Sequence, residues 1–264
     1  MSPNKSLVLF SIFILFALQS SAQYSNWEIG ASAGGAGYMG DLNQNNPLKI
    51  TGPSIGIYGK RNFSAYAGLR LNYTYGQISG NDANSSNEQF RERNLKFKTS
   101  LSELSTILDI NFFDFPINDY KRITPYVFAG VGFVVFKPKV EFDGKTYRLD
   151  RYATEGQENG YKNFALTIPY GAGVRYNYRE NWSVFSEIGY RTAHTDYLDD
   201  VSGVYPVNPV IITSGDQQLN LSDPSAAKIG VPGTQRGDFR KRDTYLFVSI
   251  GISFTFVSSK CYSF

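Results

Sequence analysis

The sequence predicts an all-β protein, an eight-stranded antiparallel transmembrane β-barrel of the outer membrane with a side-chain-filled lumen. Three observations lead to this fold: strand segments with alternating apolar residues, connections of alternating length, and an N-terminal export signal. The clearest strand is 245–256, because large apolar side chains occupy every second position and mostly small or polar residues occupy the others. These apolar residues are Leu246, Val248, Ile250, Ile252, Phe254 and Phe256.

The N-terminal segment has the features of a cleaved signal peptide. Lys5 is a basic residue, residues 7–18 form an apolar run, and small residues precede an expected cleavage after Ala22. The apolar run is too short for a membrane-spanning helix, which needs about 20 residues. We therefore expect three parts: a signal peptide (1–22), the barrel with four long outer loops (23–257) and a short periplasmic tail (258–264).

Composition limits the possible functions. Without Lys5 the chain carries 25 Lys and Arg residues against 23 Asp and Glu residues, a net charge of +2. This balance gives no indication of nucleic-acid binding. Aromatic residues make up 16% of the chain, which suits strands that are apolar on alternate positions. Cys261 is the single cysteine, so an internal disulfide is excluded and an unpaired thiol is favoured over a bond to a partner.

Two strand segments show their faces most clearly. In the third, Leu69 and Leu71 alternate with Arg70 and Asn72, and the sixth repeats this pattern. We expect the apolar face to contact lipid and the other face to line the lumen. In the first and fifth segments the lipid-facing and lumen-facing sides cannot be told apart, because Gly and Ala occupy both. The eight predicted strands are 27–38, 53–61, 65–78, 101–113, 124–136, 165–178, 182–193 and 244–257.

The connections alternate in length, as in outer-membrane barrels. Those after the second and sixth strands are very short and the one after the fourth is intermediate, whereas those after the first, third, fifth and seventh are longer. With an even number of strands, both chain ends lie on the side of the short turns. We therefore expect periplasmic termini and a location in the cell outer membrane.

The lumen-facing positions carry charges of both signs in equal number. An eight-stranded barrel is just wide enough for side chains to fill it, and buried charges are rarely retained unless they are paired. We expect an ionic plug and no channel, with Glu187 paired to Arg175 or Arg191. The predicted plug residues are Arg70, Glu103, Asp109, Arg175, Glu187 and Arg191.

Motifs for catalysis are weak. Residues 35–40 spell a nucleotide fingerprint, but turn-forming residues follow it where a helix is required. His194 is the single histidine and lies at the predicted outer rim, where a lipid hydrolase would also need a nearby serine and acid. No local pattern supplies them, so we expect no catalytic residue, no cofactor and no metal.

Two loop segments carry concentrated charge. The acids within 197–203 could bind calcium, but they lack the ligand spacing of a calcium loop and are equally common in turns. The basic segment 236–242 could contact lipopolysaccharide phosphates or remain solvated. Outer-membrane lipid and lipopolysaccharide are therefore expected neighbours.

Five stretches resemble the PorG family of type IX secretion system outer-membrane proteins: Gly37–Asn43, Ile123–Phe133, Thr154–Gln157, Ile168–Tyr176 and Gly189–Gly203. The element from Thr195 to Ser202 is the most specific of them. The resemblance implies a non-enzymatic barrel that contacts a periplasmic ring of PorK lipoprotein and PorN subunits. It supplies no catalytic residues and no role for the Thr195 to Ser202 element.

The turn side is where a periplasmic partner would make contact. The turn from Asp114 to Ile123 is the longest, and Phe115, Ile117 and Tyr120 offer apolar anchors, although the same rings would suit the lipid interface. We expect a type IX secretion component that anchors the PorK and PorN ring. A lipid A-modifying enzyme and a small ligand-binding barrel are the alternatives.

Overall fold

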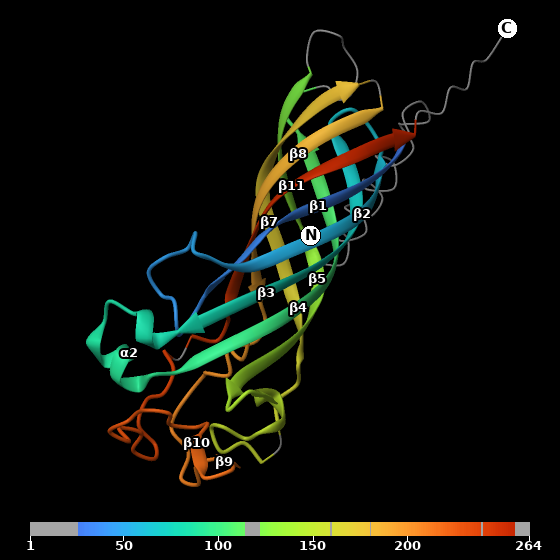
Figure 1. Ribbon diagram of the computed structural model, residues 1–264. Helices are drawn as coiled ribbons and strands as arrows, with labels where there is room; N and C mark the ends of the chain where they lie inside the picture. Colours follow the sequence, from blue (N-terminus) through green and yellow to red (C-terminus); the bar gives the residue numbers. More distant parts are fainter. Residues whose placement is uncertain (1–25, 114–121, 159, 180, 239, 257–264) are drawn as a thin grey trace, which may run out of the picture.

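Eight strands form a closed antiparallel ring (Figure 1). The computed structural model describes residues 26–113, 122–158, 160–179, 181–238 and 240–256. Pairing of the first strand with the last and of the fourth with the fifth closes the barrel, so the predicted fold class is confirmed. The strands are β1 (Asn26–Met39), β2 (Ile50–Asn62), β3 (Ala67–Asn81), β4 (Lys96–Asn111), β5 (Ile123–Phe142), β7 (Phe164–Arg179), β8 (Trp182–Ala193) and β11 (Thr244–Phe256).

The remaining elements gather beyond one end of the barrel (Figure 1). We call this the outer cap, which is built from the connections 40–49, 82–95, 143–163 and 194–243. Among the described residues, no helix is long and apolar enough to cross a membrane. The cap elements are η1 (Asp82–Asn84), α2 (Glu88–Arg93), β6 (Lys145–Arg148), η2 (Leu149–Arg151), β9 (Ile211–Ser214) and β10 (Gln217–Asn220).

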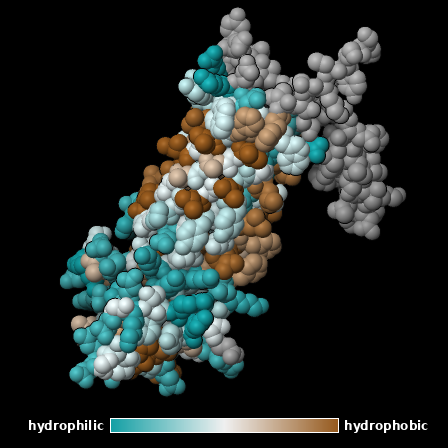
Figure 2. Space-filling model, turned by 45° about the vertical axis from the view of Figure 1, so that its right-hand side comes forward, coloured by the Kyte–Doolittle hydropathy of each residue, from teal (hydrophilic) through white to brown (hydrophobic). Residues whose placement is uncertain are grey.

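The exterior of the barrel is apolar, as lipid requires. Ile57, Leu71, Val131 and Ile250 are exposed by 62%, 56%, 58% and 66%, and Figure 2 shows apolar side chains over the barrel and hydrophilic ones over the outer cap. Every backbone group of a closed ring finds a partner without an open edge, which makes such a barrel stable in a membrane. The chain is thus a β-barrel of the outer-membrane type.

The strand faces follow the predicted alternation in the third and sixth segments. On β3, Leu69 and Leu71 are exposed while Arg70 and Asn72 are buried. On β7, Ile168 is exposed and the lumen-facing Arg175 is buried. On β11 the alternation is less regular, because Leu246 is buried with 1% exposure although Ile250 and Ile252 on the same face are exposed.

The polarity of the two faces reverses toward the outer cap. Phe97 and Phe136 are buried inside, whereas Lys98 and Lys137 are exposed outside. β4 therefore begins at Lys96 and β5 continues to Phe142, beyond the predicted limits of 101 and 136. The charged outward residues of these extensions do not resemble a lipid face, which is why the prediction stopped short. Extended β5 then pairs with β6 as a hairpin.

The strand register gives a direct test of which face meets lipid. Ile250 lies midway along β11 with its side chain outward, so Ile250→Arg should reduce the free energy of unfolding by about 2–4 kcal/mol if it lies at mid-bilayer. Ser249→Asn should have a much smaller effect, because that side chain faces the interior. Urea unfolding in lipid vesicles measures both, and equal losses would contradict the assigned faces.

Candidate functional site

The carboxylate of Asp109 is the centre of an ionic network in the lumen. Lys60 Nζ lies 3.0 Å from Asp109 Oδ2, Arg70 Nη2 lies 3.2 Å from Oδ1, and Arg175 Nη2 lies 3.8 Å from Oδ2. The four residues come from β2, β3, β4 and β7. All four are at most 2% exposed, so these charges are neutralised by one another and not by solvent.

Two further carboxylates balance the three cations. Glu187 Oε1 accepts a hydrogen bond from Arg70 Nη1 at 2.5 Å and one from the Tyr126 hydroxyl at 2.6 Å. The sequence predicts a pair between Glu187 and either Arg175 or Arg191, whereas the ion pair found is with Arg70. Glu28 lies 3.7 Å from Arg175 and 4.0 Å from Lys60.

A second, smaller network lies nearer the outer cap. Glu103 Oε2 lies 3.5 Å from Arg191 Nε and accepts a hydrogen bond from the Tyr245 hydroxyl at 2.5 Å. The guanidinium of Arg191 also lies 4.6 Å from the ring centre of Phe247, a favourable cation–π distance. The six charged residues expected in the lumen therefore all lie there and take part in ion pairs.

Lys60 and Glu28 also belong to the lumen network, although they are not among the predicted plug residues. Lys60 could have been found, because outward-facing Ile55 and Ile57 on the same strand place it inward. Glu28 lies on the glycine-rich first strand, whose faces the pattern does not distinguish. A cavity of about 20 Å³ beside Arg70, Glu187 and other lumen residues has room for about one water molecule. Around this network the side chains therefore leave little free space in the lumen.

The outer cap is held together by two buried arginines. Arg93 on α2 binds both carboxylate oxygens of Asp82, at 2.7 and 3.0 Å, and donates to the carbonyls of Arg236 and Asp41. Arg236 binds Glu155 Oε1 at 2.9 Å and the carbonyl of Asp200 at 2.6 Å. Because Arg236 is only 2% exposed, it is not a lipopolysaccharide contact, whereas Arg240 and its two successors are exposed.

A cluster of acids lies at the base of the cap. Carboxylate oxygens of Asp41, Asp199 and Asp243 lie within 4.8 Å of one another, and all three residues are buried. The hydroxyl of Tyr38 donates a hydrogen bond to Asp199. Burial and then the charge of Asp243 raise the pKa of Asp199 well above its usual value. Burial and then the charge of Asp238 raise the pKa of Asp41 to about 7.

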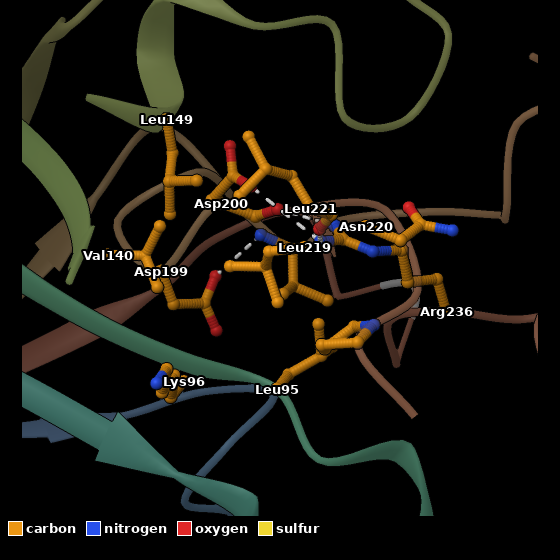
Figure 3. Close-up of a pocket in the computed structure, with 12 residues that line it drawn as sticks. Leu95, Lys96, Val140, Leu149, Asp199, Asp200, Leu219, Asn220, Leu221 and Arg236 are labelled. Carbon is orange, nitrogen blue, oxygen red and sulfur yellow. Dashed lines mark hydrogen bonds and ion pairs between the residues drawn. The ribbon is translucent and has the colours of Figure 1, made fainter. Parts of the chain in front are cut away.

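The cap cavity beside these acids is small. It measures about 30 Å³, and its lining includes Leu95, Leu149, Asp199 and Arg236. Figure 3 draws Asp199 and Arg236 at opposite sides of this space. A volume of this size has room for a water molecule but not for an organic substrate, so this cavity does not support a small-ligand barrel.

His194 lies at the rim beside a serine and an acid. Together with Asp196 and Ser202 it lines an open depression of about 500 Å³. Ser202 donates a hydrogen bond to Asp196, which opposes the rise of the Asp196 pKa that burial brings to about 6. Within the described residues the His194 side chain forms no hydrogen bond to either of them. The geometry therefore lacks the serine–histidine–acid relay of a hydrolase.

Several predicted features fall outside the described residues. Phe115, Ile117 and Tyr120 lie there, as do Cys261, the expected signal peptide and the expected periplasmic tail. The glycine-rich segment 35–40 is described, and it forms the end of β1 and the start of the first cap connection. A dinucleotide site needs a helix after such glycines, and a strand and turn occupy that place here.

The ionic network predicts strong coupling at Asp109. Asp109→Asn should destabilise the barrel by about 3–5 kcal/mol, because Lys60 and Arg70 would keep their buried charges with a weaker partner. Glu141→Gln, which removes an exposed carboxylate on β5, serves as the control and should have little effect. A double-mutant cycle with Arg70→Met, read by urea unfolding, should give a coupling energy of more than 1 kcal/mol. Additive losses would contradict the network.

Comparison with solved structures finds small outer-membrane barrels at low identity. Ail, the attachment invasion locus protein of Yersinia pestis, was crystallised with the heparin analogue sucrose octasulfate; it is 10% identical, with 89% of this chain and 100% of that chain covered and a TM-score of 0.42. Neisserial surface protein A is 13% identical, with 87% and 97% covered and a TM-score of 0.42. The N-terminal β-barrel domain of Pseudomonas aeruginosa OprF is 12% identical, with 88% and 99% covered and a TM-score of 0.37.

Comparison with protein families gives a match over nearly the whole chain. No curated protein matches the sequence. The family model covers residues 5–264, and its description is a domain of unknown function, DUF6089. The chain with its closed barrel, ionic lumen and outer cap therefore belongs to the DUF6089 family.

Proposed function

We propose that this protein is a non-conducting barrel of the type IX secretion system that anchors the periplasmic ring of PorK and PorN to the outer membrane. The observation that carries the proposal is the filled lumen, where Asp109 and its cationic partners occupy the space that a channel would need. A barrel without a passage must act through its ends. The resemblance of five sequence stretches to PorG supplies the identity of the partner.

The two ends of the barrel suit different tasks. The cap end is a packed structure of long connections, with two buried arginines binding several segments together. The opposite end carries the short connection 63–66 and exposed aromatic residues, including Trp27 and Phe113, exposed by 56% and 44%. We assign the turn end to the periplasm, where both chain termini would lie beside the ring. Phe115, Ile117 and Tyr120 are the proposed contact residues.

The outer rim supports a contact with lipopolysaccharide. Lys49, Lys96, Lys98 and Lys139 line one open depression of about 530 Å³, just above the apolar exterior of β4 and β5. Lys98 and Lys139 are direct neighbours across these strands, and like charges in that position repel each other. Phosphate groups of lipid A would remove this repulsion.

A second candidate function is lipid A modification. The observation that favours it is the shared depression of His194, Asp196 and Ser202 at the rim. The two functions give opposite results for His194→Ala. Loss of the enzyme would change the mass of lipid A while secretion continues, whereas the proposed anchor would leave lipid A unchanged.

The ring contact can be tested by adding charge to the turn. Phe115→Asp combined with Tyr120→Asp should weaken co-purification of PorK and PorN from gently solubilised outer membranes, because apolar anchors would become charged. The matched control is Val207→Asp with Val231→Asp, which charges two exposed valines of the outer cap. Trimming residues 204–237 is a poorer control, because Leu221 and Arg236 within them are buried.

Both double variants must first reach the outer membrane folded, which heat-modifiable gel mobility establishes. If the folded turn variant retains the ring at the level of the unchanged protein, Phe115 and Tyr120 are lipid-interface anchors and the proposed contact site is wrong. If the cap variant alone loses the ring, the assigned orientation is wrong.

The lipopolysaccharide contact predicts a loss of bound lipid. Lys98→Gln with Lys139→Gln should reduce lipopolysaccharide affinity, by about 1 kcal/mol for each lysine near an anionic surface. Lys162→Gln, an exposed lysine outside the depression, is the control. Mass spectrometry of lipid retained by purified protein measures the effect, and equal retention by all variants would contradict the contact.

A further inference from the structure

We infer that Asp41, Asp199 and Asp243 form a binding site for a divalent cation of the calcium type at the base of the outer cap. The three residues come from separate parts of the chain: the connection after β1, and the two ends of the connection between β8 and β11. The inference does not depend on the proposed role in secretion, because it rests on the chemistry of this cluster alone.

The spacing of the carboxylates fits one ion. Calcium binds oxygen ligands at about 2.3–2.6 Å, so two oxygens on opposite sides of the ion lie about 4.6–5.2 Å apart. One oxygen from each acid lies within 4.8 Å of the others, and a single cation can therefore contact all three. An all-oxygen set of this kind suits calcium, whereas structural zinc sites use cysteine and histidine.

An unpartnered oxygen in the cluster provides the second observation. Asp41 is 1% exposed, and its Oδ2 has no hydrogen-bond partner among the described residues, although its Oδ1 accepts from the backbone N–H of Asp238. Asp196, whose charge acts on both Asp41 and Asp243, is 8% exposed, and within the part of the chain that the structure describes its Oδ1 has no hydrogen-bond partner. A buried carboxylate oxygen without a partner is costly, and a bound cation removes that cost.

The cluster also lacks a protein cation. Among the described residues, none of the three acids forms an ion pair, since Arg93 is paired with Asp82 and Arg236 with Glu155 and Asp200. The lumen differs in this respect, because each of its buried carboxylates has an arginine or lysine. A divalent cation would neutralise the carboxylates of the cluster, as arginine and lysine side chains already do for the carboxylates of the lumen.

The surrounding backbone holds the acids in place. The N–H of Leu198 donates to Asp243 Oδ2 at 3.0 Å, and the N–H of Val201 donates to Asp199 Oδ1 at 3.0 Å. Gly40 lies so close that a Cβ there would come within 2.4 Å of Asp243 Oδ1 and 2.1 Å of the Tyr38 hydroxyl. A residue with a Cβ would clash at this position, so glycine allows the backbone to pass close to the cluster.

A cation at this point would fasten two cap connections to each other. Asp243 precedes β11 and Asp199 follows β8, while Asp41 belongs to the connection between β1 and β2. The same region contains Leu198, whose carbonyl accepts a hydrogen bond from Thr99 at 2.6 Å. The ion would thus join both ends of the longest connection to the first one, directly above the filled lumen.

Terbium and calcium titrations test the site. The protein is refolded in detergent free of lipopolysaccharide and stripped of metal with a chelator, because lipid phosphates also bind calcium. Terbium should give saturable luminescence sensitised by Tyr38, and calcium should displace it with half-saturation of about 10⁻⁶–10⁻³ M. Calcium should also raise the melting temperature of the protein.

Variants separate this site from other acids. Asp41→Asn and Asp199→Asn should each weaken calcium binding on the order of tenfold or more. Asp216→Asn removes an exposed acid in the turn between β9 and β10 and should bind calcium unchanged. The inference is overturned if Asp41→Asn binds as the unchanged protein does.

The unchanged protein alone decides the question if the variants fail to fold. An absence of both saturable luminescence and a calcium-dependent melting shift would show that the cluster holds protons in place of a cation. The inference would then be wrong.

Discussion

The pairing of Asp109 with three cations is the interaction on which the interior of this barrel depends. A barrel of eight strands has little interior volume, and here strands from opposite sides of the ring send charged side chains to one point. Lys60, Arg70 and Arg175 could not remain charged in this space without Asp109, Glu28 and Glu187. Each cation comes from a different strand, so the network also fixes how those strands are placed around the lumen. A polar interior packed with paired charges follows.

The second constraint is the change of solvent along the barrel axis. Where lipid surrounds the strands, apolar residues such as Leu71 and Ile250 face outward and charges face inward. Beyond the apolar exterior the same strands meet water, and the order reverses so that Phe97 and Phe136 fill the interior while Lys98 and Lys137 face out. The interior hydrophobic cluster there includes Leu149, Leu198 and Leu221 from the cap connections. Long connections are therefore part of the packed core. At this end of the barrel apolar residues lie inside and charged residues face outward, as in a water-soluble protein.

The ring of strands is predictable from the sequence because lipid imposes a strict alternation of exposed and buried residues on β3, β7 and most of β11. The prediction fails where that rule ends. The extensions of β4 and β5 carry lysines outward, and the hairpins and short helix of the cap have no periodic pattern to reveal them. Arg70 and Glu187 could be placed in the lumen from their strands alone, but their mutual pairing could not, since it joins residues 117 positions apart. The acid cluster was hidden for the same reason: Asp41, Asp199 and Asp243 lie far apart in sequence, and no local ligand spacing connects them.

The lumen and the outer cap differ in how their buried charges are compensated. In the lumen, four carboxylates meet four cations from the same chain, so the barrel can bury its charges when its strands pair. In the outer cap, Arg93 and Arg236 bind only part of the acids, and Asp41, Asp199 and Asp243 are buried with their repulsion unrelieved by any ion pair within the described residues. Burial raises the pKa of Asp199 and Asp243 well above the usual value. Binding of protons or of a metal ion from solution would therefore relieve the repulsion among these acids. Charge compensation in the outer cap would therefore depend on the protons and metal ions of the surrounding solution, whereas charge compensation in the lumen comes from side chains of the protein itself.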